Sequence, residues 1–443
     1  MAKLTPEIYK NLDRNFLVVD LAQAEKNAAA LKQLAGKSKL AAVVKADAYG
    51  HGLLPCARAF LAGGADYLAV ATGSAALTLR KGGITAPILL FSEAEQLHYP
   101  ELVAAGINIS LYSAAAGRKL QAAAQFTGRQ GLFHLAIDTG MSRIGFDSRL
   151  LLSALPQTLT SEQQDACPNF KLLQKQGFLL ASLTPAEAEN AAASWTTILE
   201  VLQAPELRCN GMFSHLAFAD CVGEEAALRT ERQRLLFSAF KEVLAAMGYK
   251  IPLCHLAQSA GALRYPACRF DMIRPGSLLY GLPPANCLTP TLSLVQPIAS
   301  WYAKFARIFR LPPHTPVSYG GLWQSEREVL IGVLAVGYAD GYRRNLSSKA
   351  YVILPQGEKA PIRGRICMDY CMVELPETYA VYLQRDLSEL QPAELLGDGS
   401  REEMTAWEMA AMADSFDLEV TCSITARVPR IYLRNGQQIQ AGP

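Results

Sequence analysis

The sequence predicts an α/β fold, with an N-terminal (β/α)8 barrel followed by a mostly-β C-terminal domain. The chain has 443 residues, more than one hydrophobic core usually supports, so we expect two domains. Eight short apolar runs alternate with segments of helical periodicity between Leu40 and Gly281, as the strands of a closed parallel barrel do. Beyond Gly281, prolines and then β-branched and aromatic residues indicate a second domain. Periodicity alone leaves an open doubly wound sheet as the alternative to the barrel.

The first apolar run, Phe16–Asp20, precedes the barrel, and we expect residues 1–20 to contribute a strand that pairs with the C-terminal domain. The barrel itself is expected over residues 21–285. Because each parallel strand is buried on both faces, near-continuous apolar runs predict its strands. The eight predicted strands are Leu40–Lys45, Tyr67–Thr72, Ala86–Ser92, Ile107–Ser113, Leu132–Asp138, Gly211–His215, Leu253–Ser259 and Asp271–Gly276.

One interval, about residues 151–189, is longer than a crossover between two barrel strands needs. Its prolines and polar residues favour a surface insertion after the fifth strand. The sequence leaves open whether this insertion is a lid or an oligomer contact.

The C-terminal domain is expected over residues 286–443 and is strand-rich. One stretch, Thr405–Ala413, has helical spacing. Strands are predicted over Ser300–Leu311, Val329–Val336, Ala350–Leu354, Met372–Glu374 and Asp417–Tyr432.

The composition excludes several classes of partner. The net charge is only +2, so there is no electrostatic case for binding nucleic acid or an anionic membrane. Ten cysteines lie scattered without a CxxC pair, which is typical of a reduced, cytoplasmic protein, and we expect no metal site. Neither a signal peptide nor a membrane-spanning apolar run is evident, so a soluble cytoplasmic location is the expectation.

Candidate chemistry gathers where the predicted barrel strands end, because that rim carries the active site in this fold. Lys45 ends the first strand, and apolar walls would lower its pKa and make its amine a nucleophile toward an aldehyde. The alternative is a solvated lysine just past a strand end. Further candidates lie at the same rim: Arg143 follows the fifth strand, and the sixth to eighth strands end at His215, at Ser259, and at Arg274 and Gly276.

The loops after strands seven and eight commonly form a phosphate site in such barrels, and here they offer the Ser259 hydroxyl and a glycine-containing turn at Gly276. An aldehyde-capturing lysine beside a phosphate cradle predicts pyridoxal 5'-phosphate as cofactor. Ordinary structural roles compete at single positions. His215 could be a core histidine, Arg143 a turn residue in a surface ion pair, and Tyr319 a packed strand aromatic.

Five segments in order give the chain a family resemblance. The segment Val43–Gly52 is followed by Val317–Gly321, Val336–Tyr342, Arg365–Asp369 and Arg427–Arg430. Together they resemble the alanine racemases, which are fold-type III pyridoxal-phosphate enzymes with a barrel and a C-terminal β domain. The resemblance implies a homodimer with shared active sites that interconverts L- and D-alanine and supplies D-alanine for peptidoglycan.

The resemblance also implies roles for single residues. Lys45 would bind the cofactor and act as the base for the D-enantiomer, and Tyr319 of the second subunit would be the base for the L-enantiomer. His215, resting on Arg274, would support Tyr319, and Arg274 would face the pyridine nitrogen of the cofactor. Tyr49, Ser259, Gly276 and Ser277 would hold the phosphate; Arg143 and the backbone N–H of Met368 would bind the substrate carboxylate, and Tyr338 would line the substrate entry.

Three positions depart from the family pattern. Ala136 replaces a lysine that, when carbamylated, orients the carboxylate-binding arginine, and Gln258 replaces an asparagine. Ala426 replaces a tyrosine that narrows the substrate pocket, so a racemase that also accepts serine or larger amino acids is an alternative. A fold-type III decarboxylase is disfavoured because it would need an acidic residue in place of Arg274. A non-catalytic pyridoxal-phosphate carrier is disfavoured by the C-terminal domain.

Overall fold

Eight parallel strands form the N-terminal half of the computed structural model, which describes residues 6–12, 14–94, 98–155, 159–285, 288, 293–400 and 402–439. Their spatial order is β10-β2-β3-β4-β5-β6-β8-β9, and backbone hydrogen bonds between the segments of β9 and β10 close the ring: Asp271 N–H to Cys254 O (2.9 Å) and Arg274 N–H to Ala257 O (2.9 Å). The predicted barrel is therefore confirmed. The strands are β2 Lys39–Val43, β3 Tyr67–Val70, β4 Ile88–Leu90, β5 Asn108–Leu111, β6 Gly131–Asp138, β8 Leu207–Phe213, β9 Cys254–His255 and β10 Met272–Ile273.

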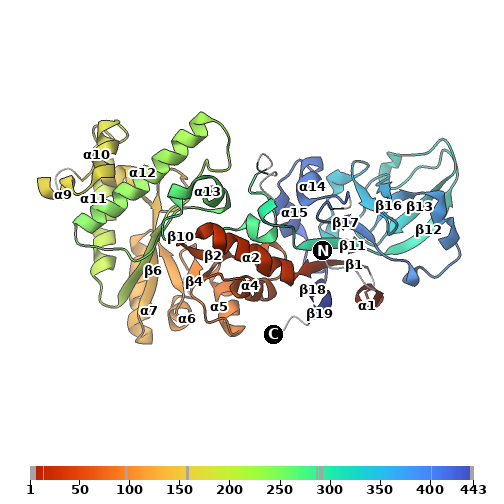
Figure 1. Ribbon diagram of the computed structural model, residues 1–443, viewed down its shortest axis with the longest axis horizontal. Coiled ribbons are helices and arrows are strands. Elements are labelled where there is room, and N and C mark those ends of the chain that lie inside the picture. The colour runs from red at the N-terminus through yellow and green to blue at the C-terminus, as the bar shows by residue number, and fades with distance from the viewer. Residues whose placement is uncertain are drawn as a thin grey trace.

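Helices alternate with these strands and surround them (Figure 1). Several begin at a side-chain cap: Asp20, Thr72 and Ser113 each accept the backbone N–H three residues ahead. Each helix buries one apolar face against the barrel, as Leu31 and Leu120 do. The barrel helices are α2 Leu21–Ala35, α3 Lys45–Tyr49, α4 Leu53–Ala62, α5 Gly73–Lys81, α6 Tyr99–Ala104, α7 Ala114–Thr127, α11 Pro185–Gln203, α12 Glu224–Ala246 and α13 Ser259–Arg264.

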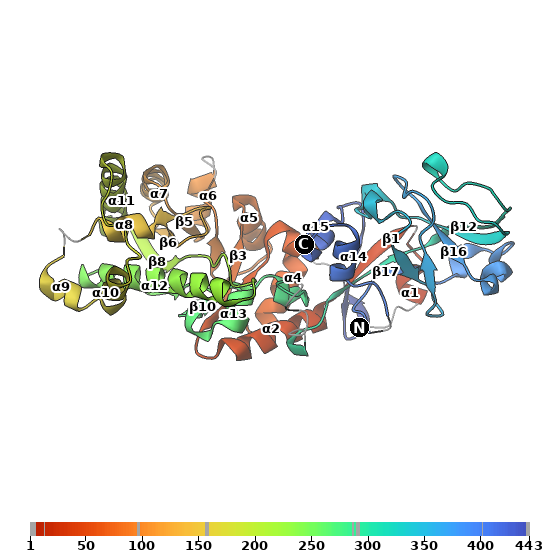
Figure 2. The same ribbon diagram turned by 90° about the horizontal axis from the view of Figure 1, so that it is seen from above.

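The insertion after β6 contains β7 Phe146–Asp147, α8 Ser148–Ser153, α9 Ser161–Asp165 and α10 Pro168–Lys175. Helix α10 packs against α12 through the buried Phe170 and Leu173, and the Asn169 N–H donates to Glu242 Oε2 (2.9 Å). In both ribbon views, α9 and α10 lie at the end of the barrel opposite the C-terminal domain (Figures 1 and 2). In the described chain, the insertion therefore covers the outside of the barrel.

The C-terminal domain lies beside the barrel along the long axis of the molecule (Figure 2). Its larger sheet has the order β15-β14-β17-β11-β1-β18-β19, in which β1 pairs antiparallel with β11 and parallel with β18. The first strand of the chain is thus held between strands from its second half. The members are β1 Asn15–Asp20, β11 Ala299–Ala303, β14 Tyr351–Ile353, β15 Lys359–Pro361, β17 Ala393–Leu396, β18 Arg430–Arg434 and β19 Gln437–Ile439.

A second, antiparallel sheet contains β12 Phe305–Leu311, β13 Val329–Leu334 and β16 Cys371–Leu375. The single strand predicted over Ser300–Leu311 is two strands, because the chain passes from one sheet to the other at Lys304. The strand predicted over Asp417–Tyr432 was also wrong for the first half of that range. Residues Asp417–Ser423 form helix α15, which packs on α14 (Ala406–Met412) with Asp417, Val420 and Thr421 buried at helical spacing.

The remaining described helices are short. They are α1 Pro6–Tyr9 and the 3-10 turns η2 Pro266–Cys268, η3 Ser277–Tyr280, η5 Tyr319–Gly321, η6 Tyr338–Asp340, η7 Arg344–Leu346, η8 Glu377–Tyr382 and η9 Leu387–Glu389. Among the described residues, no helix is long and apolar enough to cross a membrane.

Candidate active site

A cavity of about 370 Å³ opens at the C-terminal ends of the barrel strands. Its walls are mainly barrel residues, and Leu418 of α15 adds an apolar side chain from the C-terminal domain. The structure brings together in this cavity every barrel residue for which a catalytic or binding role was predicted. They are Lys45, Tyr49, Arg143, His215, Ser259, Arg274, Gly276 and Ser277.

Lys45 lies two residues after the end of β2 and starts a turn of unusual hand. The next four residues, 46–49, all have φ between 52° and 53°, the left-handed region. For residues with a Cβ this costs roughly 1–2 kcal/mol each. Tertiary contacts hold the turn: Ala48 is fully buried, Asp47 Oδ1 accepts the Leu53 N–H (2.8 Å), and a Cβ on Gly50 would collide with the backbone of α15. The turn brings the Tyr49 ring beside the Lys45 amine, with Nζ 5.9 Å from the ring centroid.

The strain in this turn should be measurable. Ala46 is exposed, so Ala46→Gly removes the steric cost of a Cβ without emptying a packed site. Because glycine also gains entropy in the unfolded chain, we expect a net rise of about 0.5 kcal/mol in the free energy of unfolding. The matched control is the exposed Ala122 inside the right-handed helix α7, where glycine should lower it by about 1 kcal/mol. Urea unfolding at equal protein concentration measures both, and equal losses in the two variants would contradict the strain.

Burial lowers the pKa of the Lys45 amine, and the positive charge of Arg143 lowers it further. A larger fraction of this amine is therefore unprotonated and nucleophilic than for a solvated lysine. Within the described residues, no hydrogen bond or ion pair fixes the Arg143 guanidinium itself. Ala136 of β6 is buried and offers only a methyl group.

Arg274 is 2% exposed and holds a chain of two histidines. Its Nη1 lies 2.7 Å from His255 Nδ1, and His255 Nε2 lies 2.9 Å from His134 Nδ1. Since a guanidinium only donates, His255 accepts at Nδ1 and must carry its proton at Nε2, from which it donates to His134. Both rings are thus neutral. Burial first and the Arg274 charge second lower the pKa of His134 to about 3 and that of His255 well below its usual value.

His215 was expected to rest on Arg274. Among the described residues, the hydrogen bonds of Arg274 go to His255 and to the backbone oxygens of Ser214 (2.6 Å) and Leu256 (3.1 Å). His215 lines the cavity, and burial, then Arg274, lowers its pKa to about 3. His255 was not predicted as a site residue. Its position in the predicted seventh strand, near the same rim, was the available signal.

One corner of the cavity is built from hydroxyls and a glycine. Ser259 starts α13, and its Oγ accepts the Gly276 N–H (2.9 Å). A Cβ on Gly276 would collide with the Tyr49 hydroxyl, so only glycine fits there. Burial raises the pKa of Tyr49, which keeps its hydroxyl a hydrogen-bond donor. Together with the start of η3 at Ser277, these groups match the donor set of a phosphate site.

The three predicted residues of the C-terminal domain do not line this cavity. Tyr319, Tyr338 and Met368 are 68%, 42% and 53% exposed in the single chain. The Ser318 hydroxyl donates to Arg365 O (2.7 Å) and fixes the backbone just before Tyr319. The structure therefore divides the predicted residues into a cavity set and an exposed set.

Fold and cavity define a class: a two-domain barrel enzyme whose cavity holds a lysine of lowered pKa just after the first barrel strand. The family model "Alanine racemase, N-terminal domain" matches residues 19–173 and 184–284, with its gap inside the insertion, and "Alanine racemase, C-terminal domain" matches residues 298–432. The chain belongs to the alanine racemase family and is an amino-acid racemase, an isomerase.

Individual relatives span almost the whole chain. An alanine racemase of Clostridium novyi is 30% identical and covers 98% of this chain and 99% of its own, and alanine racemase 1 of Oceanobacillus iheyensis is 34% identical over 90% and 92%. Among solved structures, alanine racemase of Clostridium difficile superposes with a TM-score of 0.79 at 27% identity, covering 97% and 98%. The Bacillus anthracis alanine racemase with bound L-Ala-P gives 0.77 at 27% identity, covering 96% of each chain.

Proposed function

We propose that the chain interconverts L- and D-alanine with pyridoxal 5'-phosphate, as a homodimer with shared active sites, and supplies D-alanine for peptidoglycan. The observation that carries the proposal is the cavity itself, where Lys45, its pKa lowered, shares one space with Arg274 and the phosphate-type corner. The alanine racemases that match this chain along nearly its whole length support the choice of substrate.

The residues present fit the cofactor. Lys45 would bind it covalently, and Tyr49, Ser259, Gly276 and Ser277 would hold its phosphate. Pyridoxal phosphate, when bound, withdraws electrons from the substrate α-carbon and so acidifies its proton. Arg274 would face the pyridine nitrogen and, because a guanidinium keeps its proton, leave that nitrogen unprotonated.

Racemisation removes a proton from one face of the α-carbon and returns one to the other, and two bases are the simplest arrangement. Lys45 would serve the D-enantiomer and Tyr319 the L-enantiomer, with His215 in support. The exposure of Tyr319 in the single chain favours its entry into the cavity of a second subunit. The backbone N–H of Met368 and the side chain of Tyr338, exposed on the same domain, would enter with it, and Arg143 would bind the substrate carboxylate beside Met368.

A panel of amino acids tests the proposal. With added pyridoxal phosphate, we expect L-alanine to give D-alanine with no release of carbon dioxide, measured by chiral chromatography. A broader specificity has one observation in its favour: Ala426 is small and exposed, where a tyrosine would narrow the pocket. Efficient racemisation of L-serine would establish that alternative. Carbon dioxide release, or no turnover of any amino acid, would contradict the proposed function.

A further inference from the structure

Two surface segments of the C-terminal domain, residues 337–341 and 367–370, carry Tyr338 and Met368. They contact each other backbone to backbone: the N–H groups of Tyr338 and of the following residue donate to two carbonyl oxygens of the second segment, each over 3.0 Å. A Cβ on Gly337 would collide with those carbonyls. The positions of Tyr338 and Met368 therefore depend on each other.

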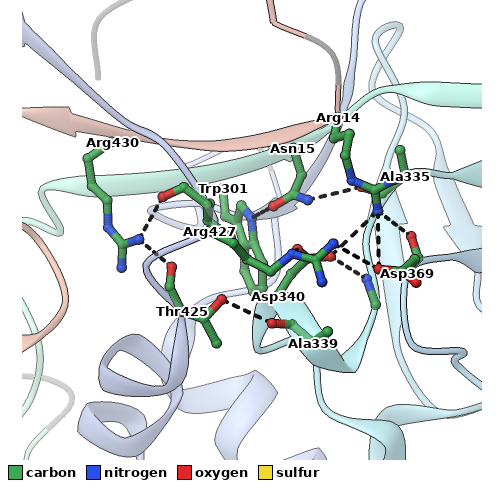
Figure 3. Close-up of polar contacts among 12 residues, drawn as sticks. Arg14, Asn15, Trp301, Ala335, Ala339, Asp340, Asp369, Thr425, Arg427 and Arg430 are labelled. Carbon is green, nitrogen blue, oxygen red and sulfur yellow. Dashed lines mark hydrogen bonds and ion pairs between the residues drawn. The ribbon is translucent and has the colours of Figure 1, made fainter.

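Each segment also carries a carboxylate, and one arginine joins the two (Figure 3). Arg427 Nε lies 3.0 Å from Asp340 Oδ1, and its Nη2 lies 2.8 Å from Asp369 Oδ1. The Asp340 side chain is 1% exposed, and its Oδ2 accepts the Gly337 N–H (2.9 Å) that closes η6. The planar guanidinium thus bridges a buried carboxylate on one segment to a half-exposed carboxylate on the other.

A second arginine, Arg14, also contacts both segments, but its distances to the two carboxylates are longer than those of Arg427. Arg14 Nη2 donates to the backbone oxygen of Asp369 (2.7 Å), and it lies 3.9 Å from Asp340 Oδ2 and 4.0 Å from Asp369 Oδ1. Arg14 is placed by its neighbour Asn15, which is bonded to Trp301 (3.0 Å) and to the backbone of Ala335 (3.0 Å; Figure 3). Removing Arg427 would leave the buried Asp340 charge with one distant cation.

Arg427 is itself fixed by the turn 424–428. The Thr425 hydroxyl and N–H donate to the backbone oxygens of Ala339 (3.0 Å) and Asp340 (3.1 Å). Arg430 donates to the Ile424 oxygen (2.7 Å) and other carbonyls of the turn, and it also reaches the Gly50 oxygen (3.1 Å) behind the Lys45 turn. These hydrogen bonds therefore fix the backbone that carries Arg427.

We propose that Arg427 is a positioning residue for substrate binding, acting through Asp340 and Asp369 to hold Tyr338 and the Met368 N–H in register. This inference rests on the proposed function, in which those two groups face the substrate of the partner subunit. In that function the Met368 N–H binds the substrate carboxylate, Tyr338 lines the substrate entry, and neither group moves a proton. Their loosening should therefore raise KM and leave kcat nearly unchanged.

The test compares Arg427→Met with Arg427→Lys in the purified enzyme with added cofactor. We expect Arg427→Met to raise KM for alanine about tenfold and to change kcat less than about twofold. Arg427→Lys keeps the charge but its ammonium reaches only one carboxylate, so an intermediate KM is expected. The control is Arg434→Met, which removes an arginine of similar exposure (41%) paired 3.2 Å from Glu25 and should leave both constants unchanged.

The experiment distinguishes failure of the Arg427 role from failure of the proposed function. A lower melting temperature with unchanged KM in Arg427→Met would show a purely structural role and overturn the inference. A KM that returns to the wild-type value at higher protein concentration would mean that Arg427 acts on assembly, and it would also overturn the inference. A wild-type enzyme without racemase activity would instead remove the proposed function. A raised KM that persists in the dimer and is partly rescued in Arg427→Lys supports the inference.

Discussion

Mixing chains that carry Lys45→Ala with chains that carry Tyr319→Phe should restore about a quarter of the wild-type racemase activity, although each variant alone should be nearly inactive. In a two-fold symmetric dimer with shared sites, every mixed dimer contains one site that lacks both groups. Its other site combines the intact Lys45 of one chain with the intact Tyr319 of the other. Random pairing makes about half of the dimers mixed, and half of the sites in these are intact, which gives the quarter.

The reason for expecting this result is the division of the site in the single chain. Lys45 lines the cavity, whereas Tyr319 is 68% exposed and lies outside the cavity lining. Loss of one acid-base group commonly lowers the rate by about 10²–10⁴-fold, so the background of each variant is low. Tyr319→Phe alone should also slow turnover of L-alanine while the cofactor absorbance is retained.

Co-expression of two differently tagged chains provides the mixed dimers, and chiral chromatography measures their activity. The control pairs Lys45→Ala with the double variant Lys45→Ala/Tyr319→Phe, which can form no intact site. If mixed dimers isolated through both tags stay as inactive as that control, Tyr319 does not act across the interface.

The barrel could be predicted because its strands carry a strong local signal. A strand buried on both faces must be apolar along its length, so runs such as that ending at Lys45 mark the strands directly. The convergence of strand ends then predicts which polar residues share a cavity. Eight residues separated by up to 232 positions, from Lys45 to Ser277, line one space for this reason.

Other features depend on tertiary contacts that leave no local pattern. The residues Lys45–Tyr49 are ordinary in a right-handed helix, and only the packing of Ala48 and α15 explains their left-handed turn. The β-branched Val420 and Thr421 suggested a strand, but burial against α14 favours a helix. His255 lay inside an apolar run and so looked like core; its role toward Arg274 depends on a hydrogen bond between neighbouring strands.

Lowering the pH from 7 to 5 should reduce the free energy of unfolding by at least about 5 kcal/mol. Burial lowers the pKa of His51 to about 4 and that of His134 and of His215 to about 3, and it lowers the pKa of His255 well below its ordinary value. In the unfolded chain these rings have a pKa near 6.5, so between pH 6.5 and the folded value the unfolded state binds more protons and acid favours unfolding. His51, His134 and His215 then each contribute about 2 kcal/mol of lost stability at pH 5, and His255 acts in the same direction.

One buried carboxyl works in the opposite direction. Burial raises the pKa of Asp417 to about 6, so the folded state binds the additional proton as the pH falls and gains about 1 kcal/mol by pH 5. The contributions of His51, His134 and His215 less this gain come to about 5 kcal/mol, and His255 adds to the net loss. Since domains are commonly stable by about 5–15 kcal/mol, unfolding should begin close to pH 5.

Urea unfolding followed by circular dichroism at pH 7, 6 and 5 measures the loss. His51→Gln removes one titrating ring and should flatten the decline between pH 7 and 5 by about 2 kcal/mol, whatever its effect at pH 7. The matched control is His314→Gln, since the His314 side chain is 64% exposed and meets water in both states. Equal declines in the two variants would mean that the His51 ring becomes charged in the folded protein, and would contradict the prediction. We do not expect this, because the ring stacks on Tyr280 at 4.8 Å and bonds the Ala48 oxygen (3.0 Å), so a charged ring could not be hydrated.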